Sequence, residues 1–134
     1  MKSTEHAVIG AVISALGVRA IGNHLSRPWK VVLWGYGLFL SVFIDLDHFV
    51  LARYYTGDWD ALLEALTTPK RALTSPEWLF SDITMRVERL LSHTIIGGVL
   101  TVGSFLVAPF LAGLTALVVY THVLCDLLRD TKTL

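Results

Sequence analysis

Four long apolar segments constrain the fold of this sequence more than any other feature. A helix needs about 20 apolar residues to cross the hydrocarbon core of a bilayer, with a lower limit near 17. The segments run from about 6 to 22, 31 to 50, 90 to 108 and 110 to 128. Only 16% of the 134 residues are charged, against about 25% in an ordinary soluble domain. We therefore expect a single all-α domain, an integral membrane bundle of four transmembrane helices.

The first segment resembles a signal peptide only at first sight. A cleaved signal peptide has a small-residue cleavage site after a short apolar core, whereas this apolar run continues to Gly22. We expect it to be retained as a membrane helix. Small residues that let helices approach closely in lipid repeat along it every four positions: Ala7, Ala11 and Ala15, and also Gly10 and Ser14.

The long connection over residues 54–89 carries its own helical pattern. Apolar residues at helical spacing predict an amphipathic helix: Trp59, Leu62, Leu63 and Leu66. Asp58 can cap its start, Pro69 follows its end, and Ser75-Pro76-Glu77 predicts another helix start. We expect an interfacial helical loop that lies along the membrane surface and covers one end of the bundle. A partly mobile linker is the alternative.

Helix order gathers the ionisable residues of the apolar segments on one side of the bilayer. If the four segments cross alternately, seven His and Asp residues meet there, and we call them the His/Asp cluster: His6, Asp45, Asp47, His48, His93, His122 and Asp126. All eleven Asp and Glu residues lie at this end or beyond it. Ionisable groups inside membrane segments are costly, by about 2.5–3.5 kcal/mol each on insertion scales, so they need partners.

A shared cation is the natural partner for His with Asp. His122 and Asp126 are four residues apart and Asp45 and His48 three, so each pair projects from one helical face. Asp47 points away from that face in an ideal helix, and it contributes only if the helix frays or if it orients a ligand. Imidazole and carboxylate without thiolate suit zinc, manganese or iron. We expect one to three divalent ions, with zinc first, and a plain hydrogen-bonded polar cluster is the alternative.

Four motifs carry a resemblance to a known family. They are His6–Gly10 (HAVIG), Asp45–His48 (DLDH), Arg89–Thr94 (RLLSHT) and His122–Asp126 (HVLCD). In order and placement they resemble the HxxxG, DxDH, HRGxTHS-like and HxxxD motifs of the YdjM-like family of membrane-bound, predicted metal-dependent hydrolases. The resemblance covers almost the whole chain. That family is thought to be distantly related to zinc-dependent phospholipase C and P1-type nucleases, which implies hydrolysis of a phosphoester.

One motif departs from the family pattern. Glu88 stands where the family has its first His, and Leu90 stands in place of the glycine, while Arg89 and His93 are kept. By the resemblance, Glu88 would bind metal or act as a base. Arg89 would steady an anionic substrate or transition state.

These observations predict a membrane-bound metal-dependent hydrolase that acts on a phosphoester or lipid-like substrate at the bilayer surface. Metal-bound water with a pKa near about 7 would be its nucleophile. The alternatives are a non-enzymatic metal-binding protein, a scaffold that binds a protein partner through residues 54–89, and, ranked lowest, a transporter. A net charge of zero and the lack of a basic stripe argue against a nucleic acid partner.

Orientation follows from the basic residues. Eight of the eleven Lys and Arg residues fall on the cluster side, and three fall on the other side. The positive-inside rule therefore places the cluster at the cytoplasmic face of the cell membrane. The short basic turn over residues 19–30 favours the opposite orientation.

Overall fold

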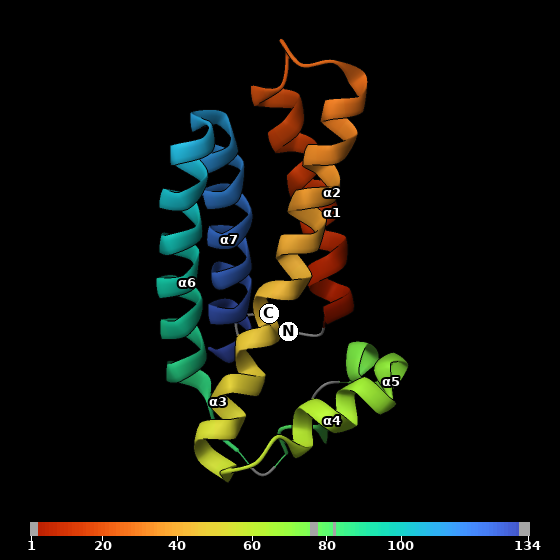
Figure 1. The fold of residues 1–134 in the computed structure, drawn as a ribbon, viewed down its shortest axis with the longest axis vertical. Coiled ribbons are helices and arrows are strands. Elements are labelled where there is room, and N and C mark those ends of the chain that lie inside the picture. The colour runs from red at the N-terminus through yellow and green to blue at the C-terminus, as the bar shows by residue number, and fades with distance from the viewer. Residues whose placement is uncertain (1–2, 76–77, 82, 132–134) are drawn as a thin grey trace.

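Every regular element of the described chain is a helix. The structure, a computed structural model, describes residues 3–75, 78–81 and 83–131. The elements are α1 (Ser3–Ile21), α2 (Arg27–Phe43), the 3-10 turn η1 (Ile44–Leu46), α3 (Asp47–Thr56), α4 (Asp60–Thr67), α5 (Pro69–Thr74), α6 (Arg86–Val107) and α7 (Pro109–Asp130). Figure 1 shows α1, α2, α6 and α7 running side by side along the long axis, with α4 and α5 at one end. The predicted all-α bundle is confirmed.

Four helical stretches are long and apolar enough to cross a membrane: Ser3–Ile21, Arg27–Thr56, Arg86–Val107 and Pro109–Asp130. Their outward surfaces are apolar, with exposed side chains such as Val12, Phe39, Val99 and Phe105. The buried side chains instead include His6, His93, His122 and Asp126. Apolar residues outside and ionisable residues inside are the distribution expected when lipid is the solvent, and they indicate a membrane protein.

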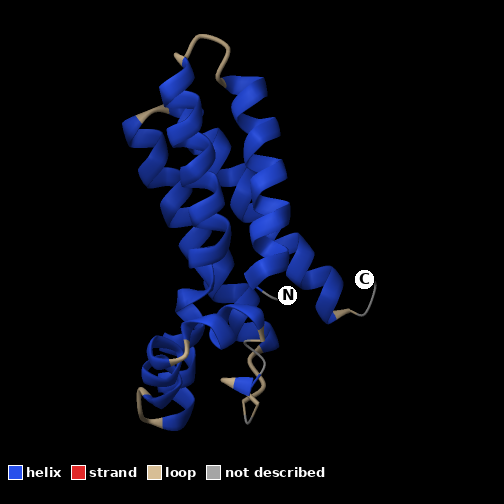
Figure 2. Ribbon diagram, turned by 90° about the vertical axis from the view of Figure 1, so that its right-hand side faces the viewer, coloured by secondary structure: helices blue, strands red, loops and turns tan. Residues whose placement is uncertain are grey.

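Proline and glycine mark the ends of several helices. Ala108 is the single extended residue between α6 and α7, and Pro109 begins α7. Proline suits the first turn of a helix because the missing N–H would have no partner there. Gly57 ends α3 in the left-handed region (φ 87°), and its N–H donates to the carbonyl of Arg53 at 2.9 Å. The loops that join α1 to α2 and α6 to α7 are short (Figure 2).

Small residues bring α1 and α2 into close contact. A Cβ atom on Gly10 would collide with Ser41, and one on Gly37 would collide with Ser14. Gly10 and Ser14 are buried, whereas Ala15 of the other repeating set is exposed. The Gly10–Ser41 contact positions the site, because His6 lies about one turn before Gly10 and Asp45 about one turn after Ser41.

The connection between α3 and α6 is largely helical. Asp58 Oδ1 accepts the N–H of Asp60, the first residue of α4, at 3.1 Å. Helix α5 contacts α1, so the loop folds back under the bundle (Figure 1). Pro76 and Glu77, where the sequence predicts another helix start, lie outside the described residues.

Candidate metal centre

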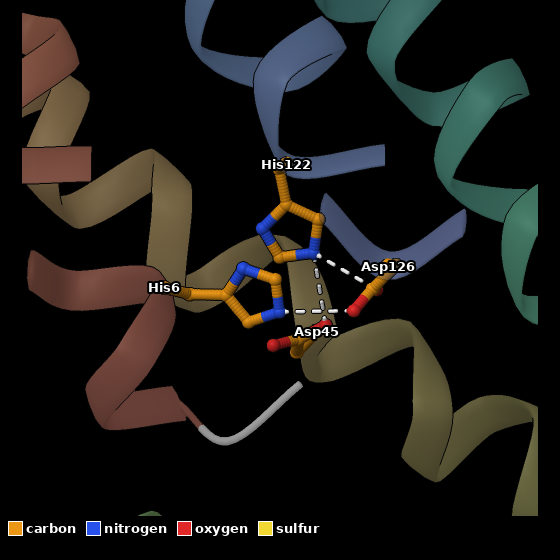
Figure 3. A group of neighbouring side chains, drawn as sticks. All are labelled: His6, Asp45, His122 and Asp126. Atoms are coloured by element: carbon orange, nitrogen blue, oxygen red, sulfur yellow. Dashed lines mark hydrogen bonds and ion pairs between the residues drawn. The ribbon is translucent and has the colours of Figure 1, made fainter. Parts of the chain in front are cut away.

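Residues from three segments of the chain converge at the loop end of the bundle. His6 comes from α1, Asp45 from η1, and His122 and Asp126 from α7. One ligand atom of each lies within 4.8 Å of those of the other three. Figure 3 shows the four side chains pointing toward one another. His6, His122 and Asp126 are at most 3% exposed, so this group is shielded from water.

Nitrogen and oxygen atoms alternate within this first group. His6 Nε2 lies 3.1 Å from Asp126 Oδ1. His122 Nε2 lies 3.3 Å from Asp45 Oδ1 and 3.5 Å from Asp126 Oδ2. The two imidazole rings are stacked, with centroids 3.7 Å apart. Facing imidazole nitrogens and carboxylate oxygens are a donor set that zinc, manganese and iron accept.

A second group shares Asp45 with the first. It consists of Asp45, His48 and His93, again with ligand atoms within 4.8 Å of one another. Asp45 Oδ1 lies 3.0 Å from His93 Nε2 and 3.5 Å from His48 Nε2. With His122, three Nε2 atoms therefore surround one carboxylate oxygen.

A 3-10 turn within the second membrane segment explains the placement of Asp47. The sequence suggested one continuous helix over residues 31–50, but the chain tightens into η1 between α2 and α3. Asp47 Oδ2 lies 2.9 Å from His93 Nδ1, and Ser92 Oγ donates a hydrogen bond to the same oxygen. Asp45 and Asp47 thus contact opposite nitrogens of the His93 ring. Asp47 belongs to neither group of ligand atoms, so its place is that of a residue that orients a ligand.

The hydrogen bond of His122 leaves its other nitrogen facing two carboxylates. His122 Nδ1 lies 2.9 Å from the carbonyl oxygen of Ser41. A carbonyl only accepts, so the hydrogen is on Nδ1, and Nε2 of the neutral ring carries a lone pair. Nε2 is buried and has no hydrogen-bond partner among the described residues. A lone pair that faces carboxylate oxygens needs a positive charge between them, and a metal ion bound to Nε2 would supply it, so the residues fit a metal ion. A second proton on the ring would satisfy the same position in a plain polar cluster.

Buried negative charge also favours a cation. The side chains of Asp45, Asp47 and Asp126 are 15%, 8% and 1% exposed. Arg89 approaches with one positive charge, and its Nε lies 3.7 Å from Asp126 Oδ2. Its Nη2 lies 2.7 Å from Asp130 Oδ2. The positive charge of Arg89 is therefore shared between Asp126 and Asp130. Carboxylates removed from water need close compensation, and a divalent ion would supply it.

Glu88 lies apart from the cluster. Its side chain is exposed, and its Oε1 accepts a hydrogen bond from Tyr55 Oη at 2.8 Å. It belongs to neither group of ligand atoms. Of the two residues that the sequence suggested for catalysis, only Arg89 adjoins the cluster.

Two serines support the site, and sequence reasoning did not assign them. The Ser41 carbonyl accepts the hydrogen bond of His122, and the Ser41 hydroxyl shares its hydrogen between the carbonyls of Leu38 at 2.8 Å and His6 at 3.3 Å. The Ser92 hydroxyl has one hydrogen and lies within hydrogen-bond distance of both Asp47 Oδ2 and the carbonyl of Arg89. The signals were weak: Ser41 precedes Asp45 by four residues, and Ser92 precedes His93 directly.

Comparisons with protein-family models, with curated proteins and with solved structures found no match. Function must therefore be inferred from the geometry of the site itself.

Proposed function

We propose that this chain is a membrane-bound metal-dependent hydrolase with its centre at one face of the bilayer. The observation that carries the proposal is the convergence of three imidazole nitrogens on Asp45 Oδ1, with His6 and Asp126 beside them. Two groups of ligand atoms that share Asp45 favour two ions. The residues that would hold them are His6, Asp45, His48, His93, His122 and Asp126. Zinc is the ion we expect, since imidazole nitrogens and carboxylate oxygens are common zinc ligands.

Such an ion supplies activated water near neutral pH and polarises a phosphoryl or carbonyl oxygen. The chain's own residues prepare the site. The Ser41 carbonyl holds His122 by a hydrogen bond, and Asp47 Oδ2 lies 2.9 Å from His93 Nδ1, where the two can form an ion pair. Arg89 lies at the edge of the cluster, where its guanidinium can steady an anionic group.

The substrate class rests on the resemblance to the YdjM-like family. The HxxxG, DxDH and HxxxD motifs supply five of the six residues of the two groups, and the third motif supplies the sixth, His93. That family's distant relation to zinc-dependent phospholipase C and P1-type nucleases supports a phosphoester. A centre at the end of membrane helices also favours a lipid-like substrate.

Packing in the middle of the bundle argues against transport. Tyr36 Oη and Ser104 Oγ both hydrogen-bond Thr115 Oγ1, at 2.8 and 3.1 Å. Thr115 is fully buried and lies among the apolar residues of the core, such as Leu114 and Val118. These hydroxyl groups therefore form hydrogen bonds with one another. Among the described residues, ionisable groups of the kind that mark ion pathways lie only at the helix ends.

A non-enzymatic role is the second candidate. Glu88 departs from the family pattern and lies on the exposed surface, and α4 exposes Leu63 and Leu66. A metal-binding scaffold that recruits a protein partner through residues 54–89 would use these features.

Metal analysis and hydrolysis of p-nitrophenyl phosphate by the detergent-purified chain test the proposal. Wild type should contain a divalent metal, and the double variant His122→Ala/Asp126→Ala should lose both metal and hydrolysis. The matched control is His24→Ala, because His24 lies at the opposite end against Phe110. Metal kept at wild-type stoichiometry in the double variant would refute the metal centre. Bound metal without hydrolysis of any phosphoester would favour the scaffold.

A further inference from the structure

A cavity of about 720 Å³ adjoins the His/Asp cluster. It lies between the end of the second membrane segment and the helical loop. Its apolar lining includes Val42, Phe43 and Leu46 on one side and Leu62, Leu66 and Ala72 on the other. Ligand sites typically enclose about 300–1,000 Å³ with mostly apolar walls, so this cavity has the size and lining of a binding site.

The cavity reaches the cluster directly. Asp45, His48 and Arg89 belong both to its lining and to the cluster or its edge. The ring of Phe80, from the loop, packs edge-on against His48 with centroids 5.8 Å apart. A ligand in the cavity would therefore lie with one end beside the second group of metal ligands.

The described residues that line the cavity include basic as well as acidic side chains. Three arginines line it, Arg86, Arg89 and Arg129, against the carboxylates of Asp45 and Asp130. Arg89 is engaged by Asp130 at 2.7 Å, and Arg129 lies 3.8 Å from Glu5. Arg86 is exposed and forms no ion pair with a described residue. Guanidinium groups favour phosphate, which they bind through paired hydrogen bonds.

We propose that the cavity binds a membrane phospholipid with a phosphomonoester head, of the phosphatidic acid type. The hydrocarbon chain lies along the apolar walls that α2 and α4 provide, and the phosphate lies among Arg86, Arg89 and Arg129 beside the cluster. Free phosphate would leave the apolar walls in contact with water, and a neutral lipid would offer no anionic partner to Arg86. Hydrolysis of the bound phosphoester would rest on the proposed function, whereas binding of the lipid does not.

Photolabelling of the full chain in phosphatidylcholine nanodiscs tests this site. The probe is phosphatidic acid with a diazirine in its acyl chain, and the controls are the matching phosphatidylcholine and fatty acid probes. Labelling by the phosphatidic acid probe should exceed both and should map to residues 62–73 and 79–81. Equal labelling by the neutral probe, stronger labelling by the fatty acid, or labels elsewhere would overturn the proposal.

Chelator-treated protein separates this inference from the proposed function. Labelling should persist after the metal is removed, since the arginines and the apolar walls remain. Persistent labelling in a chain that neither binds metal nor hydrolyses p-nitrophenyl phosphate would refute the hydrolase and keep the lipid site. Hydrolysis of that small ester without selective labelling would refute the lipid site alone.

Paired variants test the two ends of the cavity. Arg86→Gln should lower labelling roughly tenfold, the loss expected for a hydrogen bond to a charged group. Lys70→Gln should not, because Lys70 lies on α5 outside the lining. Ala72→Trp should block the apolar end, whereas Ala61→Trp, on α4 and outside the lining, should not. Unchanged labelling in both Arg86→Gln and Ala72→Trp, with helical content intact, would overturn the proposal.

Discussion

Ser41 fixes the orientation of His122, whose Nδ1 atom donates a hydrogen bond to the Ser41 carbonyl oxygen at 2.9 Å. The Ser41 hydroxyl lies 3.3 Å from the carbonyl oxygen of His6 and 2.8 Å from that of Leu38, so its one hydrogen is shared between them. One small residue of α2 therefore contacts the ring of His122 and the backbone of His6, the two residues whose imidazoles are stacked. This arrangement requires α1 and α2 to be very close, and Gly10 makes that closeness possible.

Replacing Gly10 with alanine should weaken the fold and the metal centre together. The added Cβ would collide with both Oγ and Cβ of Ser41, so rotation of the hydroxyl cannot relieve the contact. Overpacking of this kind typically costs about 1–3 kcal/mol. Thermal unfolding and metal titration in detergent measure the two effects. Gly35→Ala is the matched control, because nothing lies within 4 Å of a Cβ there. Equal unfolding temperatures for the two variants would contradict this account.

Replacing Asp47 with asparagine should weaken metal binding without abolishing it. Asp47 contacts the Nδ1 atom of His93 and lies outside both groups of ligand atoms. Loss of such an orienting carboxylate typically lowers metal affinity about 10–100-fold. Asp45→Asn should be more severe, because Asp45 belongs to both groups. Metal titration of the two variants decides the ranking. A larger loss at Asp47 than at Asp45 would exchange their roles.

The bundle was predictable from the sequence because length and hydropathy alone determine which segments can span a bilayer. The gathering of His and Asp residues at one end was also predictable, because successive segments cross the bilayer in opposite directions. The orienting contact of Asp47 was not, because an ideal helix points it away and the 3-10 turn at Ile44–Leu46 has no clear signature in the sequence. The support from Ser41 was also hidden, since it depends on which faces of α1 and α2 meet. The cavity depends on how residues 54–89 fold back against the bundle, and the hydrophobic periodicity of the sequence does not determine that arrangement.

Removing the Glu88 carboxylate should leave metal content unchanged. Its Oε1 is bonded to Tyr55 on the exposed surface, away from both groups of ligand atoms. Surface substitutions of this kind usually change the free energy of unfolding by no more than about 0.5 kcal/mol. Glu88→Ala and Tyr55→Phe should therefore match wild type in metal stoichiometry and in thermal unfolding. A loss of metal from Glu88→Ala alone would show that Glu88 reaches the cluster in the working protein.

Chelation should lower the unfolding temperature of the wild-type chain. A ligand that binds only the folded state stabilises it by about 2.7 kcal/mol when its free concentration is 100 times the dissociation constant. Thermal unfolding with a chelator, and again after excess zinc is restored, measures this contribution. His122→Ala/Asp126→Ala should show no chelator effect, because two members of the first group are gone. A plain hydrogen-bonded cluster would make wild type as indifferent to chelation as the double variant. In that case the buried carboxylates would have to be balanced by protons on the imidazoles, since His122 Nε2 faces Asp45 and Asp126 at 3.3 and 3.5 Å.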